Sequence, residues 1–390
     1  MTHKILMLLS TFPSLGGVQK QSLQLSFALR EAGHEVFFAA WKSAAACELP
    51  ESFPFELVYL PDKENLHSRD NSDFLYQYIV HKSIDIVLNQ GVELLIYQRF
   101  NGSEKHKVIN VLHAEPSWLF QRRRHMSLPR QAWRLSRWKA DLRCAYVRLC
   151  PGHSDKKVVQ MLMDEITQAA AYVVLHPSYK EKILSLLPSD KQIALRRKVY
   201  AIPNPVGASS VVSKGEKIVL YAGRLSCADK GVDTLLRVWA KVQQQLPDWQ
   251  LHLRGDGPDK SKLQRLARRL SLQNVQFLPA LNDDSIYAEA SVFALTSRTE
   301  AQGLGLMEAQ QAGIVPVAFE LNEMISEMLQ QGKTGLLVPA RDEQAYAQAL
   351  LQICQDDDLR ATMSQAARLH MQNYRMDKVL PLWLRLFDEC

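Results

Sequence analysis

The sequence has few cysteines and no long apolar run or short repeat. Its six cysteines are scattered over 390 residues, and none forms a Cys-x-x-Cys pair. This argues against a structural metal site or a disulfide framework and fits a reducing cytosol. No apolar run approaches the roughly 20 residues that span a bilayer. The short apolar stretch at 5–9 precedes no small-residue cleavage site. We therefore expect a cytoplasmic protein with ordinary globular cores.

Positive charge is concentrated in one segment. Residues 121–150 contain nine Lys or Arg against the single Asp141, whereas the whole chain carries only +6. A uniformly basic nucleic-acid binder is therefore excluded, and an RNA-binding arm is the weaker interpretation because no nucleic-acid module surrounds the segment. Two interpretations stay open. In the first, the segment contacts anionic lipid head groups or an acceptor. In the second, its apolar helical stripe packs into the core of the first domain while its arginines are solvated. The stripe is Trp138, Leu142, Ala145 and Leu149.

Short apolar runs alternate with helical patterns along the whole chain, which predicts an α/β fold with parallel sheets. Residues 201–217 are rich in Pro, Gly and Ser and divide the runs into two series. We expect two doubly wound, Rossmann-like domains joined near residue 205, with ligands in a cleft between them. The predicted strands are 5–9, 36–40, 84–88, 108–112, 172–175, 218–222, 250–254, 275–278, 292–295, 314–318 and 335–338.

Two strand-to-helix loops of the second series contain residues suited to a phosphorylated ligand. Arg224 and Lys230 lie in YAGRLSCADKG, where two cations and a helix N-terminus suit a diphosphate. The alternative is a solvated loop with two surface cations. Glu300 and Glu308 lie in TEAQGLGLMEA, whose turn opens a helix, so that its N–H groups can face an anion. A helical carboxylate can also accept hydrogen bonds from a ribose diol.

These motifs resemble the retaining, metal-independent glycosyltransferases of the GT-B fold, glycosyltransferase family 4. The resemblance covers most of the chain, and its most specific element is the Glu-x7-Glu block from Glu300 to Glu308. The motifs that carry it are SLGGVQ, VLHAEP, LHPSYKEKIL, AIPNPV, YAGRLSCADKGVDTLL, LRGDGP, SRTEAQGLGLMEAQQAGIVPVA and GKTGLLVPARD.

The resemblance implies roles for the loop residues of the second domain. Glu308 is expected to hold the nucleotide ribose, and Glu300 to lie beside the donor sugar. Arg224 and Lys230 would hold the diphosphate, so that neither a metal ion nor another cofactor is expected. Residues 303–304, Gly303 and Leu304, belong to the same donor-binding turn.

The resemblance also implies roles for the first domain. Gly16 and Gly17 would approach the donor, and His113 would lie near the reacting centre. The implied domains are an acceptor-side domain, 1–205, to which a C-terminal helix at about 372–390 returns, and a donor-binding domain, 206–371.

The expected function is sugar transfer from a nucleotide-sugar donor to a glycan or lipid-linked acceptor, in assembly of a bacterial-type surface polysaccharide or lipopolysaccharide. Peripheral contact with the inner face of the cytoplasmic membrane would place the enzyme near such an acceptor. Many members have a Gly pair after the Gly-x-Pro-Val strand, where this chain has AFELNEM. That departure favours one alternative, a non-catalytic sugar-nucleotide-binding partner. The other is a sugar-nucleotide epimerase on the same fold. A nicotinamide enzyme is disfavoured because SLGGVQ lacks the Gly-x-Gly-x-x-Gly spacing.

Overall fold

The computed structural model describes most of the chain as two compact units. The described residues are 2–14, 16–44, 49, 53–92, 105–124, 151–207, 209–280 and 284–390. Unit 1 contains Met1–Pro203 and Leu380–Cys390, and unit 2 contains Asn204–Val379. No helix in the described part is long and apolar enough to cross a membrane. The basic segment 121–150 lies outside the described residues except for the backbone of 121–124, so its expected contacts remain predictions.

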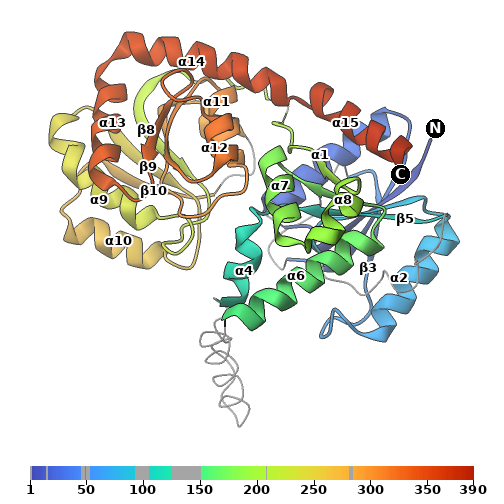
Figure 1. The fold of residues 1–390 in the computed structure, drawn as a ribbon. Helices are drawn as coiled ribbons and strands as arrows, with labels where there is room; N and C mark the ends of the chain where they lie inside the picture. Colours follow the sequence, from blue (N-terminus) through green and yellow to red (C-terminus); the bar gives the residue numbers. More distant parts are fainter. Residues whose placement is uncertain are drawn as a thin grey trace. The chain divides into compact units, whose positions relative to one another are not determined.

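Unit 1 is built on a parallel sheet whose strand order, over the described residues, is β3-β2-β1-β4-β5-β6-β7. Helices cover both faces of the sheet (Figure 1). The strands are β1 (Lys4–Thr11), β2 (Glu35–Lys42), β3 (Glu56–Tyr59), β4 (Ile86–Asn89), β5 (Lys107–Leu112), β6 (Ala171–Val174) and β7 (Val199–Ala201). The helices are α1 (Gly17–Glu31), α2 (Arg69–Lys82), α4 (Ser117–Arg124), α6 (Pro151–Gln168), α7 (Pro177–Leu186) and α8 (Ser189–Arg196).

Unit 2 repeats this plan with the strand order β10-β9-β8-β11-β12-β13. The strands are β8 (Glu216–Ala222), β9 (Gln250–Arg254), β10 (Val275–Leu278), β11 (Ala290–Leu295), β12 (Val315–Glu320) and β13 (Leu336–Pro339). The α-helices are α9 (Val232–Val242), α10 (Lys260–Arg269), α11 (Leu304–Gln311), α12 (Glu323–Met328), α13 (Glu343–Gln355) and α14 (Asp357–Met371). The 3-10 turns are η1 (Gln243–Gln245), η2 (Asp284–Tyr287) and η3 (Gln372–Tyr374). The last helix, α15 (Met376–Glu389), begins in unit 2 and continues into unit 1.

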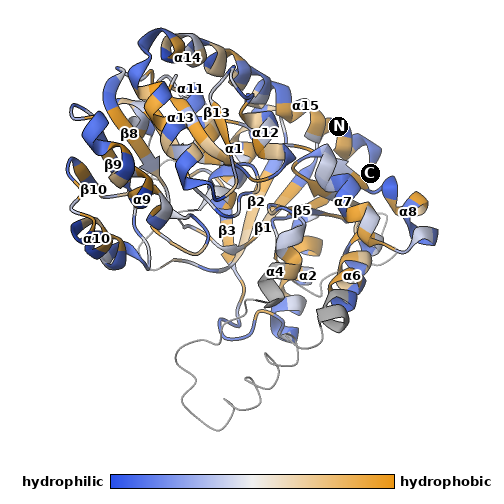
Figure 2. Cartoon of the chain, turned by 60° about the vertical axis from the view of Figure 1, so that its left-hand side comes forward, coloured by the Kyte–Doolittle hydropathy of each residue, from blue (hydrophilic) through white to orange (hydrophobic). Residues whose placement is uncertain are grey.

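The central strands form because their residues are apolar throughout and are covered on both sides. Residues 5–8 of β1 and all of β11 are buried. The strands are coloured as hydrophobic, whereas the outer faces of helices such as α10 are hydrophilic (Figure 2). The predicted fold class, two parallel Rossmann-like α/β units, is confirmed.

Two edge strands of unit 1 correct the predicted strand set. The sequence pattern does not predict β3 or β7, because β3 is half exposed and β7 has only three residues. Edge strands of this kind need no continuous apolar run, since one side has no neighbouring strand. In both sheets the order in which successive strands are added reverses between two parallel central neighbours, at β1/β4 and at β8/β11. Ligands of doubly wound sheets bind at the carboxyl ends of such strands.

Candidate functional site

The loops that follow β8 and β11 bring together two of the predicted site residues. Lys230 Nζ lies 2.5 Å from Glu300 Oε1, and Ser297 Oγ donates to the same carboxylate oxygen at 2.7 Å. The two charged side chains are only 26% and 12% exposed. A pair so shielded from water is held more firmly than a surface ion pair. The structure thus places one cation and one carboxylate at the β8/β11 switch point.

The backbones of the same two loops are bonded to each other. The carbonyl of Asp229 accepts hydrogen bonds from the N–H groups of Arg298 at 2.7 Å and Thr299 at 3.3 Å. Gly231 has φ +59° and opens α9, and a Cβ on it would lie 2.1 Å from the carbonyl oxygen of Thr296. Only glycine permits this approach. The two loops therefore form one connected surface at the edge of the sheet.

Arg224 lies in the same loop as Lys230 but has a different partner. Its guanidinium pairs with Asp229, and its side chain is 62% exposed. Burial acts to raise the pKa of Asp229, but the hydrogen bond from Ser226 and the charge of Arg224 hold it below its ordinary value. Arg224 is thus a mostly exposed cation, and the N–H donors of its guanidinium that Asp229 does not occupy can bind an anion.

Glu308 is positioned by a residue that the motif does not contain. The phenol of Tyr287, which is 2% exposed, donates to Glu308 Oε2 at 2.8 Å. Burial and the neighbouring carboxylate raise the pKa of Tyr287 well above its ordinary value, so the phenol stays protonated as a donor. Gly303 lies at the N-cap of α11 with φ +73°, and Leu304 is the first residue of the helix. The N–H groups in the first turn of α11, which have no partner within the helix, therefore lie next to this loop.

Asn322 lies near the place where many members of the resembled family have a Gly pair. Its side-chain amide donates to the carbonyl of Glu300 at 2.8 Å, and its Oδ1 accepts from the N–H of Ile325 at 3.0 Å, which caps α12. One side chain therefore holds both the Glu300 loop and the start of α12. Nearby Glu327 accepts a hydrogen bond from Tyr374 at 2.6 Å.

The predicted residues of unit 1 follow two central strands of its sheet. Gly16, the N-cap of α1, is extended at φ −151°, and Gly17 begins the helix. His113 follows β5, and its Nε2 lies 2.5 Å from Oε1 of Gln90, which follows β4. The amide oxygen can only accept, so Nε2 carries the proton and Nδ1 is the basic nitrogen. Burial lowers the pKa of His113 to about 4.

This pKa predicts a pH-dependent stability. The unfolded chain binds the proton near pH 6.5 and the folded chain near pH 4, so protonation favours unfolding as the pH falls through this interval. The free energy of unfolding should therefore fall by on the order of 3 kcal/mol between pH 7 and pH 4 through this group. Chemical denaturation across that range should show a smaller loss for His113→Gln. Replacement of the exposed His67 by Gln is the control, and equal slopes for wild type and His113→Gln would contradict the assignment.

Sequence reasoning missed Tyr287, Gln90 and Gln302. The Gln302 amide is 2% exposed and is bonded reciprocally to the backbone of Asn204, accepting from its N–H at 2.8 Å and donating to its carbonyl at 2.9 Å. Gln302 lies inside the Glu-x7-Glu block, and this position was the signal that the sequence offered for it. The partners of all three residues are distant in the sequence and depend on the strand order.

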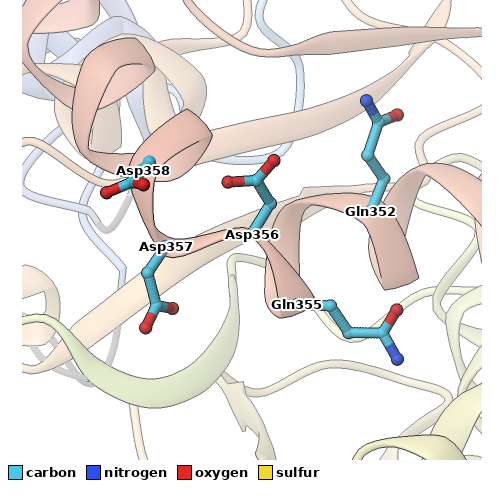
Figure 3. A pocket seen from close by; sticks show the side chains of 5 residues that line it. All are labelled: Gln352, Gln355, Asp356, Asp357 and Asp358. Atoms are coloured by element: carbon cyan, nitrogen blue, oxygen red, sulfur yellow. The ribbon is translucent and has the colours of Figure 1, made fainter.

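A surface pocket lies at the junction of α13 and α14, and none of the predicted site residues lines it (Figure 3). Its carboxylates already serve the start of α14. Asp356 accepts from the N–H of Leu359 at 2.8 Å, and Asp357 pairs with Arg360. We assign it no ligand. Over the described ranges, no group of three or more His, Cys, Asp and Glu residues is arranged to hold a metal ion. The pocket lining is Gln352, Gln355, Asp356, Asp357 and Asp358.

Known proteins are similar to this chain in sequence or in fold. An uncharacterized glycosyltransferase of Haemophilus influenzae is 28% identical over 212 residues, which cover 52% of this chain and 60% of that protein. A phosphatidyl-myo-inositol mannosyltransferase of Mycolicibacterium smegmatis is 27% identical over 398 residues, which cover 97% of this chain and 91% of that protein. The crystal structure of Anabaena Alr3699/HepE in complex with UDP and glucose superposes with a TM-score of 0.73 at 16% identity, with both chains fully covered.

The family model described as Glycosyl transferases group 1 matches residues 208–370, which lie within unit 2 and contain Arg224, Lys230, Glu300 and Glu308. Unit 2 is thus similar to the Glycosyl transferases group 1 domain, and the chain has the fold of the GT-B glycosyltransferases.

Proposed function

We propose that the protein is a retaining, metal-independent glycosyltransferase. It moves a sugar from a nucleotide-sugar donor to a glycan or lipid-linked acceptor in the assembly of a surface polysaccharide or lipopolysaccharide. The observation that carries this proposal is the ion pair between Lys230 and Glu300, at the β8/β11 switch point of a domain similar to the Glycosyl transferases group 1 domain. The mannosyltransferase relative, whose name contains a phosphatidyl lipid, supports the lipid-linked acceptor.

In this mechanism the two loop cations bind the donor diphosphate. Lys230 and Arg224 neutralise the negative charge that grows on the departing nucleotide, and such fixed charges lower the barrier because they need no reorganisation. The sugar carbon becomes oxocarbenium-like as the bond to the phosphate oxygen breaks. The acceptor oxygen attacks from the same face, and the leaving phosphate takes its proton.

The carboxylates and the histidine position the reactants. Glu300, fixed by Lys230, Ser297 and Asn322, orients the donor sugar. Glu308, fixed by Tyr287, binds the ribose diol. His113 is neutral at pH 7 because its pKa is about 4, so it acts near the reacting centre as a hydrogen-bonding group rather than as a cation.

A donor panel tests the function. The purified chain should transfer or hydrolyse one nucleotide sugar in the presence of EDTA, with the anomeric configuration preserved when the product is followed by NMR. Activity that EDTA abolishes and manganese restores would contradict the metal-free role of Lys230 and Arg224. Epimerised donor without transfer would favour the epimerase, and binding without turnover would favour the non-catalytic partner.

A further inference from the structure

Arg254 has a buried nitrogen without a partner at the carboxyl edge of the second sheet. Its Nε is inaccessible to water, and among the residues that the structure describes it makes no hydrogen bond. An unsatisfied buried N–H is unfavourable, and most buried polar groups in folded proteins have a partner. Arg254 is the last residue of β9, whose carboxyl end is the edge at which ligands of this fold bind. No group in the described part of the chain holds the guanidinium by this nitrogen, so a ligand that draws the side chain toward itself would supply the missing partner.

The backbone around Arg254 is locked to the neighbouring loop. The Arg254 carbonyl accepts from the N–H of Gly223 at 3.0 Å. Gly255 has φ +153°, and a Cβ on it would lie 1.9 Å from the Gly223 carbonyl oxygen. The loops after β8 and β9 thus touch through their backbones. The position of Arg254 relative to the loop that carries Arg224 is fixed as a result.

The strand register shows on which face of the sheet Arg254 lies. Arg254 is the register partner of Ala222, and Leu220 is the partner of Phe293. Register partners share a face, as do residues two apart in one strand, so Arg254 and Phe293 lie on the same face. A Cβ on Gly305 would lie 3.3 Å from the Phe293 ring. The first turn of α11 therefore covers the face to which Arg254 belongs.

The strand order then gives Arg254 a place along the nucleotide. In the order β9-β8-β11, Glu300 follows β11, the two loop cations follow β8, and Arg254 ends β9. Under the proposed function, the sugar lies beside Glu300 and the diphosphate beside the β8 loop. The position beyond the diphosphate, at the end of β9, is then the nucleoside end. It lies on the face of the sheet that is covered by α11, the helix that carries Glu308.

We propose that Arg254 is a further donor-binding residue that donates hydrogen bonds to an acceptor atom of the nucleobase. This inference rests on the proposed function and deepens it, because it assigns a residue that selects among nucleotide bases. A guanidinium offers several N–H donors in one plane and matches the acceptor edge of a base.

Calorimetry with nucleotides tests this role. The wild type is titrated with UDP, GDP and ADP, and the best diphosphate is then compared with its monophosphate. Arg254→Met should bind both about tenfold more weakly, by the same factor, and should lose the preference among bases. Arg254→Lys should also bind weakly, because lysine keeps the charge but not the planar donors. Arg265→Met, an exposed arginine of α10, is the matched control and should bind as the wild type does.

The melting temperature separates this role from a structural one. Without nucleotide, Arg254→Met should melt no lower than the wild type, since it removes an unsatisfied N–H. A lower melting temperature, or nucleotide binding equal to that of the wild type, would overturn the inference. A loss that is larger for the diphosphate than for the monophosphate would place Arg254 on the phosphates and overturn its base role. If the wild type binds no nucleotide, the proposed function fails as well, whereas weak binding by Glu308→Ala but not by Arg254→Met rejects this inference alone.

Discussion

Replacing Lys230 with alanine should lower the turnover number by about 100- to 1,000-fold, the range typical for loss of one group that stabilises charge in a transition state. Lys230 is the cation held at the β8/β11 switch point by Glu300, 2.5 Å away. Its loss removes charge where the leaving diphosphate becomes more negative, so the effect should be larger on kcat than on KM. Steady-state kinetics with the donor identified by the panel measures both.

The pairing with Glu300 allows a sharper test of the same residue. In Lys230→Ala, Glu300 keeps a shielded negative charge beside the diphosphate and should repel it. The double variant Lys230→Ala/Glu300→Gln should therefore recover part of the nucleotide affinity but not the turnover. Lys217→Ala, an exposed lysine that pairs with Asp248 at 3.2 Å, is the control. A Lys230→Ala enzyme with unchanged kcat would show that the leaving group is stabilised elsewhere.

Replacing Glu308 with alanine should weaken binding of the nucleoside diphosphate by about 10- to 100-fold, because a hydrogen bond to a charged group contributes roughly 1.5–3 kcal/mol. Tyr287→Phe should give the same kind of loss but a smaller one, since it removes only the 2.8 Å hydrogen bond that orients the carboxylate. Isothermal titration calorimetry measures both variants, and the exposed Glu289→Ala serves as control.

A 2′-deoxynucleotide distinguishes ribose binding from a general effect of charge. The wild type should bind the 2′-deoxy diphosphate more weakly than the ribonucleotide. Glu308→Ala should bind the two about equally, because the group that senses the hydroxyl is gone. If the variant still discriminated between them as strongly as the wild type, Glu308 would not be the ribose ligand.

The central architecture was predictable because continuous apolar runs identify strands that are buried on both faces. The runs at 5–9 and 292–295 lie within β1 and β11. The edge strands β3 and β7 escaped prediction, since short or half-exposed strands have no such pattern. A single sequence also does not show which strands are neighbours in the sheet, so the placement of β8 beside β11 had to come from the structure.

The same reason explains what was missed in the site. The resemblance implied that Lys230 and Glu300 both face a ligand, but their mutual contact depends on which loops become neighbours. Tyr287 lies outside the motifs named above and matters through its contact with Glu308. Arg254 lies inside LRGDGP, but the resemblance gave it no role, and its place at the sheet edge comes from the structure. Local pattern thus identified residues with suitable chemistry, whereas their partners were determined by tertiary structure.

The backbone hydrogen bonds between the β8 and β11 loops reduce the conformational entropy that the protein loses when the donor binds. Asp229 accepts from two consecutive N–H groups of the other loop, and Gly231 lies against Thr296. The cation and the carboxylate therefore stand on a scaffold that is assembled before any ligand arrives. Ordering flexible segments on association lowers affinity, so a preorganised scaffold leaves more of the contact energy available for discrimination between donors and for the transition state.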